Sequence, residues 1–107
     1  MNFTGMLKDG TLKNKVILIT GGGTGLGKSM GKYFMELGAH LIITSRKQYI
    51  LDKTAKEFEA YSGEIFPVSA DVRDAKEVKR VIQASLEKFG KVDVLVNNAA
   101  GNFISPT

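Results

Sequence analysis

Five glycines between Thr20 and Lys28 are the residues whose type and spacing point most clearly to chemistry. Such a run is poor material for a packed core, because each glycine loses much conformational entropy when it is ordered. It follows the apolar residues 16–19 and precedes a segment with helical periodicity. A helix N-terminus presents unpaired N–H groups and the positive end of the helix dipole, which suits a phosphate group. We therefore expect a strand, a loop and a helix that together bind a nucleotide phosphate.

The same stretch satisfies two different nucleotide-binding patterns. Residues 22–29 have the sequence G-x-x-x-x-G-K-S, the phosphate loop of ATP and GTP hydrolases, in which Lys28 would contact the phosphates and Ser29 would hold magnesium. Residues 20–27 have the sequence T-G-x-x-x-G-x-G, a more widely spaced glycine loop. A glycine loop alone is a weak signal, so the remainder of the chain has to decide between the two patterns.

The rest of the chain alternates between β-branched apolar runs and segments with helical periodicity. These predict strands at residues 15–20, 40–45, 64–70 and 92–97, and helices at residues 25–37, 47–61 and 74–89. This order predicts an α/β fold, a Rossmann-type doubly wound parallel sheet of strand order 3-2-1-4 that is truncated after strand 4. Its ligand crevice would lie at the carboxyl ends of the first and fourth strands. We expect residues 1–14 to be a lead-in and residues 15–107 to be the N-terminal half of a dinucleotide-binding domain.

Helical spacing also predicts which side chains face the sheet. Asp74 would cap the third helix, and Gly38 and Gly90 stand where helix C-termini favour glycine. The inward faces would consist of Leu26, Met30, Phe34 and Leu37 on the first helix, and of Val78, Val81, Ile82, Ser85, Leu86 and Phe89 on the third.

Three observations favour a dinucleotide over ATP or GTP. A phosphate-loop enzyme needs an Asp at a strand end to position magnesium, but the fourth strand ends in Asn97 and Asn98, and the third is only partly apolar before Asp71. The second strand ends about twenty residues beyond the glycines, where a dinucleotide fold binds the adenosine ribose. The sequence NNAAG at residues 97–101 has no role in a phosphate-loop enzyme.

The chain resembles the short-chain dehydrogenase/reductase superfamily. The resemblance rests on the glycine loop at residues 20–27, on Asp71 and Val72 after the third strand, and on NNAAG at residues 97–101. These stretches occur in the superfamily's order and cover essentially the whole chain from Lys15.

Within the superfamily the chain is most similar to the N-terminal part of a 2,4-dienoyl-CoA reductase. The similarity lies in GGGTGLGK at residues 21–28, SRK at residues 45–47 and, above all, NNAAGNFISPT at residues 97–107. It implies an NADPH-dependent oxidoreductase of fatty acid metabolism that reduces a 2,4-dienoyl-CoA by hydride transfer. The small-molecule partner would be an acyl-CoA.

The resemblance implies roles for individual residues. Arg73 and Phe103 would help to bind the acyl-CoA, and Asn102 would be catalytic, donating a hydrogen bond to the thioester carbonyl as a dienolate forms. A neutral amide can stabilise a developing enolate oxygen in this way. The implied cofactor-binding residues are Gly21, Gly22, Gly23, Thr24, Gly25, Leu26, Gly27, Arg46, Asp71, Val72, Asn97, Asn98 and Ala99.

The residue type at position 46 supports the NADP(H) assignment independently. A 2′-phosphate needs a fixed bidentate cation, which arginine supplies. An NAD enzyme would place Asp or Glu at the end of the second strand instead. Since this chain has Ser45 and then Arg46, NADP(H) is favoured over NAD(H).

The superfamily's catalytic Tyr-x-x-x-Lys motif lies well beyond the fourth strand, so we expect this fragment to lack it and to have no turnover alone. The parent protein would be more than twice as long and a homo-oligomer. Without further strands, the apolar residues 94–96 would form an exposed sheet edge. We therefore expect marginal stability or self-association through the strand 4 edge.

Composition argues against several other functions. The net charge of +4 is spread through the helical segments, so a nucleic-acid-binding patch is not expected. The absence of cysteine excludes disulfides, and no His, Asp or Glu cluster has metal-ligand spacing, so no metal is predicted. No apolar run has the length of a membrane span and the N-terminus has no apolar signal segment, so a cytoplasmic location is expected.

Three alternatives stay open. The chain could belong to another NADP(H)-dependent short-chain dehydrogenase with a 3-oxoacyl, sugar or alcohol substrate. It could be a nucleotide-binding remnant without catalysis. A P-loop ATP- or GTP-binding protein survives only through residues 22–29.

Overall fold

The computed structural model describes residues 11–21, 25–98 and 103–106, the last four by their backbone. The predicted alternation of strands and helices is confirmed, and one further strand follows it. The elements are β1 (Val16–Thr20), α1 (Gly25–Glu36), β2 (His40–Ser45), α2 (Gln48–Phe58), β3 (Ile65–Ser69), α3 (Ala75–Phe89), β4 (Val94–Asn97) and β5 (Phe103–Pro106).

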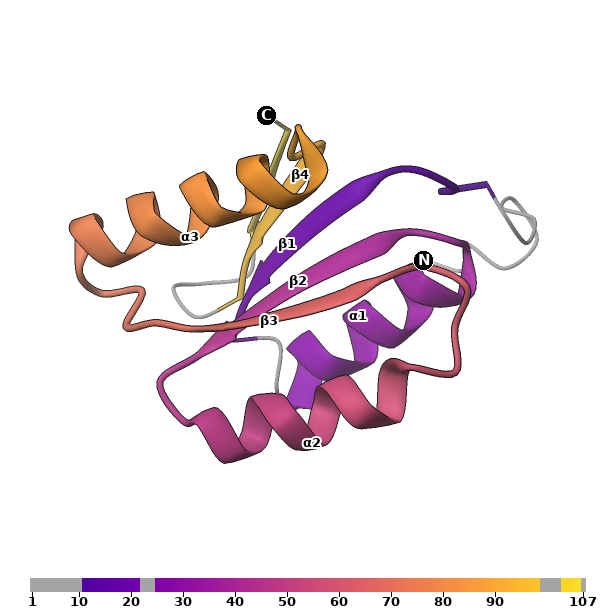
Figure 1. Ribbon diagram of the computed structural model, residues 1–107, viewed down its shortest axis with the longest axis horizontal. Helices are drawn as coiled ribbons and strands as arrows, with labels where there is room; N and C mark the ends of the chain where they lie inside the picture. Colours follow the sequence, from indigo (N-terminus) through magenta and orange to yellow (C-terminus); the bar gives the residue numbers. More distant parts are fainter. Residues whose placement is uncertain (1–10, 22–24, 99–102, 107) are drawn as a thin grey trace.

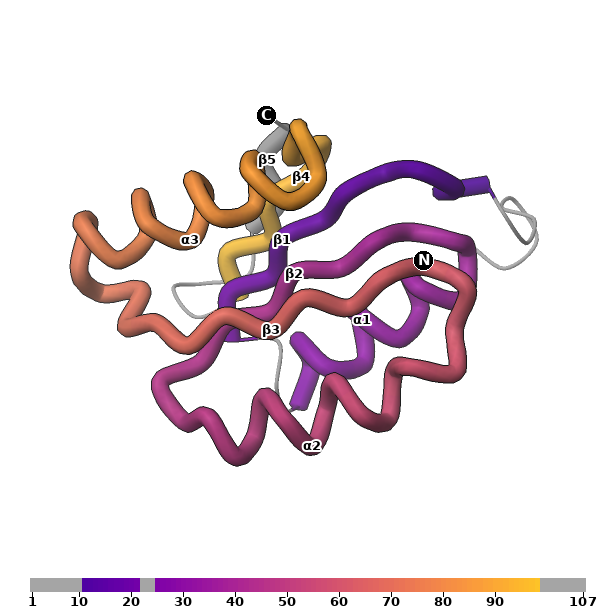
Figure 2. The backbone as a smooth tube through the Cα atoms, in the orientation of Figure 1, coloured from indigo at the N-terminus to yellow at the C-terminus, as the bar shows by residue number. Residues whose placement is uncertain are grey.

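The strands form one sheet of order β3-β2-β1-β4-β5, in which the first four are parallel. This confirms the predicted 3-2-1-4 order, which can be followed in Figure 2. The expectation of an open β4 edge is wrong, because β5 runs antiparallel along it, with Asn97 opposite Phe103 and Val94 opposite Pro106. The pairing satisfies backbone N–H and C=O groups that an edge strand would leave free.

The sheet is covered on both faces. Figure 1 shows α1 and α2 together on one face and α3 on the other. Strand β1 is buried along its whole length, as its uninterrupted apolar sequence predicts. Alternate residues of β1 and β2 point to opposite layers: Ile17, Ile19, Leu41 and Ile43 pack on the side of α1 and α2, and Val16, Leu18 and Ile42 pack on the side of α3.

Two predicted inward side chains point outward instead. Leu26 is 57% exposed and Leu86 is 46% exposed. Helix α1 buries Gly27, Gly31 and Met35 in place of Leu26. A Cβ on Gly31 would lie 2.7 Å from Leu41 Cδ2. The glycines therefore let the backbone of α1 lie close to the sheet, which the spacing of its large apolar side chains did not indicate.

The ends of α3 follow the predicted chemistry. The carboxylate of Asp74 accepts a hydrogen bond from the Lys76 N–H at 2.9 Å. Gly90 ends the helix with φ of 81°. Within residues 11–21, 25–98 and 103–106, no helix combines the length and apolar character that crossing a membrane requires.

Candidate nucleotide-binding site

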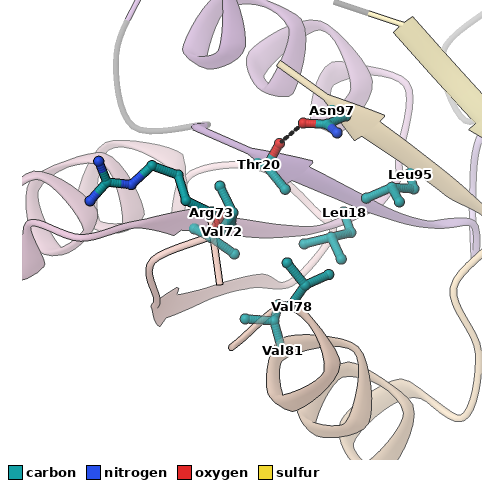
Figure 3. A pocket seen from close by; sticks show the side chains of 9 residues that line it. Leu18, Thr20, Val72, Arg73, Val78, Val81, Leu95 and Asn97 are labelled. Atoms are coloured by element: carbon teal, nitrogen blue, oxygen red, sulfur yellow. Dashed lines mark hydrogen bonds between the residues drawn. The ribbon is translucent and has the colours of Figure 1, made fainter. Parts of the chain in front are cut away.

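Hydrogen bonds join the carboxyl ends of β1 and β4. The Thr20 hydroxyl donates to Asn97 Oδ1 at 3.0 Å, as drawn in Figure 3. The Asn98 side-chain amide donates to the Gly21 carbonyl oxygen at 3.3 Å. The first residue of the glycine loop is therefore held against the end of β4, where the crevice was predicted.

The glycines next to the loop are required by geometry. Gly21 and Gly25 have φ of 70° and 58°, a region that disfavours residues with side chains. A Cβ on Gly27 would overlap the Gly21 carbonyl oxygen and lie 2.9 Å from Asn98 Nδ2. Because the first turn of α1 contains no acidic residue, the positive end of its dipole is free to attract an anion. This arrangement fits the pyrophosphate of a dinucleotide.

A hollow of about 240 Å³ lies at the carboxyl ends of β2 and β3, and we call it the polar hollow. It brings together predicted cofactor-binding residues from three separate strand ends, namely Gly21, Arg46, Asp71 and Val72. Thr44, Ser45, Ala70 and Arg73 complete its lining. Arg46 is exposed there and forms no ion pair with any residue that the structure describes.

Asp71 and Arg73 form one ion pair at the rim of the polar hollow. Arg73 Nε and Nη2 donate to the two carboxylate oxygens of Asp71, each at 3.0 Å, and the Arg73 N–H donates to Oδ1 at 3.0 Å. These hydrogen bonds, with a smaller contribution from the nearby charge of Arg46, hold the pKa of Asp71 at about 2. A predicted cofactor ligand and a predicted substrate ligand are thus bound to each other.

A second hollow of about 150 Å³, the apolar cavity, lies between the sheet and α3 (Figure 3). Val78 and Val81 of α3 face Leu18 of β1 and Leu95 of β4 across it. The Arg73 guanidinium points away from these apolar side chains. Thr44, Val72 and Arg73 line both the apolar cavity and the polar hollow, so the two spaces adjoin.

Lys28 has a structural partner. Its ammonium group lies 2.5 Å from Glu57 Oε2 and so connects α1 to α2. The same hydrogen bond lowers the pKa of Glu57. In a phosphate-loop enzyme this lysine would contact the nucleotide phosphates. Here it contacts Glu57 of α2 instead.

The Tyr-x-x-x-Lys spacing does occur once in the chain, which corrects the expectation that it would be absent. Tyr49 and Lys53 have this spacing, and both lie on α2. Tyr49 is 68% exposed, and neither residue lines the polar hollow or the apolar cavity. This pair is therefore not part of the candidate site, although it has the spacing of the catalytic motif.

The remaining predicted site residues are not among the described residues that line the polar hollow or the apolar cavity. Phe103 belongs to β5, and only its backbone is described. Leu26 lies in the first turn of α1, exposed beside the glycine loop. Gly22, Gly23, Thr24, Ala99 and Asn102 lie outside the described residues.

Sequence reasoning missed two threonines at the site. Thr20 ends β1 and joins it to β4, and Thr44 lies opposite Thr20 on β2. The Thr44 carbonyl oxygen accepts a hydrogen bond from the Gly21 N–H at 3.0 Å. The available signal was a threonine near the carboxyl end of each of two strands whose central residues are apolar.

Comparison with known proteins finds relatives of similar sequence. A probable 2,4-dienoyl-CoA reductase of Bacillus subtilis is 40% identical over 95 residues, which are 89% of this chain and 37% of that protein. A probable 2,4-dienoyl-CoA reductase 3 of Caenorhabditis elegans is 46% identical over 104 residues, 95% of this chain and 34% of that protein. The chain thus spans about a third of the length of these curated relatives.

Solved structures show the same fold with either nicotinamide cofactor. A 3-ketoacyl-(acyl-carrier-protein) reductase from Brucella melitensis, complexed with NADH, is 40% identical with a TM-score of 0.72, over 79% of this chain and 34% of that one. An L-sorbose reductase from Gluconobacter frateurii, complexed with NADPH and L-sorbose, is 31% identical with a TM-score of 0.81, over 87% and 36%. The sequence pattern of the family described as short chain dehydrogenase matches residues 15–107. This chain belongs to the short chain dehydrogenase family.

Proposed function

We propose that the chain binds NADP(H) across the carboxyl edge of its sheet. The pyrophosphate lies between the glycine loop and the N-terminus of α1, where Gly27 permits close approach. The adenosine half enters the polar hollow beside Asp71 and Val72. Asn97 and Asn98 support the β4 end next to the cofactor through their hydrogen bonds to Thr20 and Gly21.

The preference for NADP(H) over NAD(H) rests chiefly on Arg46. Its guanidinium is exposed at the polar hollow and has no ion-pair partner in the described part of the chain. A planar guanidinium can donate two parallel hydrogen bonds to a phosphate. The carboxylate that an NAD enzyme would use to bind the ribose hydroxyl is not present at this position.

The start of α2 supports the same preference. Lys47 is the N-cap residue of α2, and its side chain forms no cap hydrogen bond. The first turn of α2, which the structure describes in full, contains no acidic residue. Two cationic residues, Arg46 and Lys47, therefore precede the positive end of a helix dipole. An anion at this point would relieve their mutual repulsion, which is what a 2′-phosphate provides.

Replacing Arg46 tests this proposal. We expect Arg46→Ala to weaken NADPH binding by about ten- to hundredfold, the effect of losing charge-assisted hydrogen bonds, and to leave NADH affinity unchanged. Lys32→Ala removes an exposed positive charge on α1 and is the matched control. Titration calorimetry gives both dissociation constants. Equal loss of NADPH affinity in the two variants would mean that net charge, not Arg46, determines binding.

For the whole protein we propose reduction of a 2,4-dienoyl-CoA by hydride from NADPH. The proposal is supported by the two relatives named above and by the run at residues 97–107. Asn102 would hydrogen-bond the thioester oxygen, and Arg73 and Phe103 would contact the acyl-CoA. A cytoplasmic location and homo-oligomeric assembly also stay predictions.

A 3-oxoacyl substrate is the second candidate, since a 3-ketoacyl reductase shares 40% identity with this chain. NADPH consumption with a 2,4-dienoyl-CoA and with a 3-oxoacyl thioester separates the two. We expect turnover of the dienoyl-CoA by the protein that carries the family's later catalytic motif, and a roughly hundred- to thousandfold lower kcat in Asn102→Ala. Turnover of the 3-oxoacyl thioester alone would contradict the dienoyl-CoA proposal.

A further inference from the structure

The Thr44 hydroxyl is the polar group of the site that the fold leaves unexplained. Thr44 is 0% exposed, and its Oγ1 has no hydrogen-bond partner among the described residues. Its neighbour at the same level of the sheet, Thr20, instead uses its hydroxyl to bind Asn97 Oδ1 and the Val96 carbonyl oxygen of β4. Of the two paired hydroxyls, that of Thr20 therefore connects strands, and that of Thr44 has no partner among the residues that the structure describes.

Burying such a hydroxyl is unfavourable for folding. A hydroxyl that leaves water without gaining a hydrogen bond carries a desolvation penalty. The three residues that precede Thr44 in β2 are Leu41, Ile42 and Ile43, and an apolar β-branched residue would suit the strand equally well. The hydroxyl therefore costs stability in the ligand-free chain, which indicates that it has a partner in another state.

The position of Thr44 indicates what that partner is. Thr44 lies in the wall between the polar hollow and the apolar cavity. Arg46 and Asp71 line the polar hollow, and Val78 and Leu95 line the apolar cavity. A ligand that contacts this wall would place polar or charged groups in the polar hollow and a less polar group in the apolar cavity. The adenosine half of a dinucleotide has this composition.

Thr44 is also held firmly relative to the proposed phosphate-binding loop. Its carbonyl oxygen accepts the Gly21 N–H at 3.0 Å, so the backbone of β2 and the start of the loop are joined at this residue. A hydroxyl on such a fixed backbone loses little freedom when it forms a hydrogen bond, which makes that bond effective in binding.

We propose that the Thr44 hydroxyl forms a hydrogen bond with the adenosine half of the bound dinucleotide. Thr44 is then a cofactor-binding residue in addition to those that the sequence predicts. This inference rests on the proposed dinucleotide binding. It concerns the affinity for either cofactor, whereas the preference for NADPH over NADH is assigned to Arg46.

The test compares Thr44→Val and Thr44→Ser with the unmodified protein. NADPH and ADP-ribose, which contains the adenosine half but no nicotinamide, are titrated into each by calorimetry. We expect Thr44→Val to bind both ligands about five- to tenfold more weakly, which corresponds to the loss of one hydrogen bond. Thr44→Ser keeps the hydroxyl and should retain the original affinity for both ligands.

Thermal unfolding without ligand supplies the second measurement. Thr44→Val should melt at the original temperature or higher, because it removes a buried hydroxyl without a partner. Thr20→Val is the matched control and should melt lower, since it loses the hydrogen bonds to β4. Unchanged affinity of Thr44→Val for both ligands would overturn the inference. A lower melting temperature would overturn its premise, because it would show that the hydroxyl already has a stabilising partner in the ligand-free protein.

The outcomes also separate this inference from the function on which it rests. If the unmodified protein binds NADPH and Thr44→Val binds it equally well, only the role of Thr44 is wrong. If the unmodified protein binds neither NADPH nor ADP-ribose, the proposed function fails and the inference fails with it.

Discussion

A single carbon atom on Gly27 would prevent the glycine loop and α1 from meeting as they do. The added Cβ would overlap the Gly21 carbonyl oxygen, a backbone atom that cannot move without displacing the loop. We expect Gly27→Ala to lower the free energy of unfolding by about 1–3 kcal/mol, a typical cost of overpacking, and to weaken NADPH binding. Urea unfolding and NADPH titration of the same preparation measure both effects.

Gly90→Ala is the control for that variant. Gly90 has φ of 81°, so alanine there is strained by roughly 1–2 kcal/mol, but the space around it is open. Gly90 ends α3 and lines neither hollow of the site. It should therefore lose stability and keep its NADPH affinity. If Gly27→Ala also kept its NADPH affinity, close approach at Gly27 would have no part in cofactor binding.

The Asp71–Arg73 ion pair predicts a response to acid. Arg73 holds the pKa of Asp71 at about 2, below the ordinary value of about 3.9. Because the folded-state pKa is depressed, the contribution of the pair to stability is complete above the ordinary value and is lost as the pH falls toward about 2. NMR titration of the Asp71 carboxyl carbon should give a midpoint near that lower value. In Arg73→Ala the midpoint should return toward the ordinary range, and an unchanged midpoint would show that Arg73 is not the cause.

At the scale of elements, β5 changes what is expected of the sheet edge. It pairs with β4, so residues 94–97 are no longer an exposed apolar edge. Deleting residues 103–107 should uncover that edge and produce concentration-dependent self-association in sedimentation velocity. Deleting Thr107 alone leaves β5 intact and is the control. Identical sedimentation of the two forms would show that β5 does not protect the edge.

The elements that the sequence predicted are those with a local physical signature. β1 and β2 are continuous β-branched runs, and α3 begins at a capping Asp74 and ends at Gly90. β5 has no such signature, because its four residues include Pro106, and proline in a sequence usually indicates a turn or loop. Proline is tolerated in edge strands, and β5 lies at the edge of this sheet, as does β3 with its Pro67.

Contacts between elements explain what the sequence could not predict at the site. The spacing of Gly21, Arg46 and Asp71 placed them at three strand ends, and the parallel sheet brings them to one hollow. The isolated hydroxyl of Thr44 could not be foreseen, because its burial depends on how α3 and the segment after β3 pack above β2. The outward position of Leu26 likewise depends on the close approach of α1 to the sheet.

At the scale of the whole molecule, a layer of helices covers each face of the sheet, and the proposed ligand-binding surface lies at its carboxyl edge (Figure 1). Gly21, the first glycine of the loop that matched two nucleotide-binding patterns in the sequence, lies at that edge. Lys28 pairs with Glu57 of α2, and Arg46 stands exposed at the polar hollow. These contacts support the proposal that the chain binds a dinucleotide with a 2′-phosphate rather than ATP or GTP.

Titration of the unmodified chain with NADPH, NADH and ATP, each with and without magnesium, tests this central claim most directly. The account predicts that NADPH binds most tightly, about ten- to hundredfold better than NADH, and that magnesium has no effect on its affinity. Magnesium-dependent binding of ATP without any response to NADPH would contradict it.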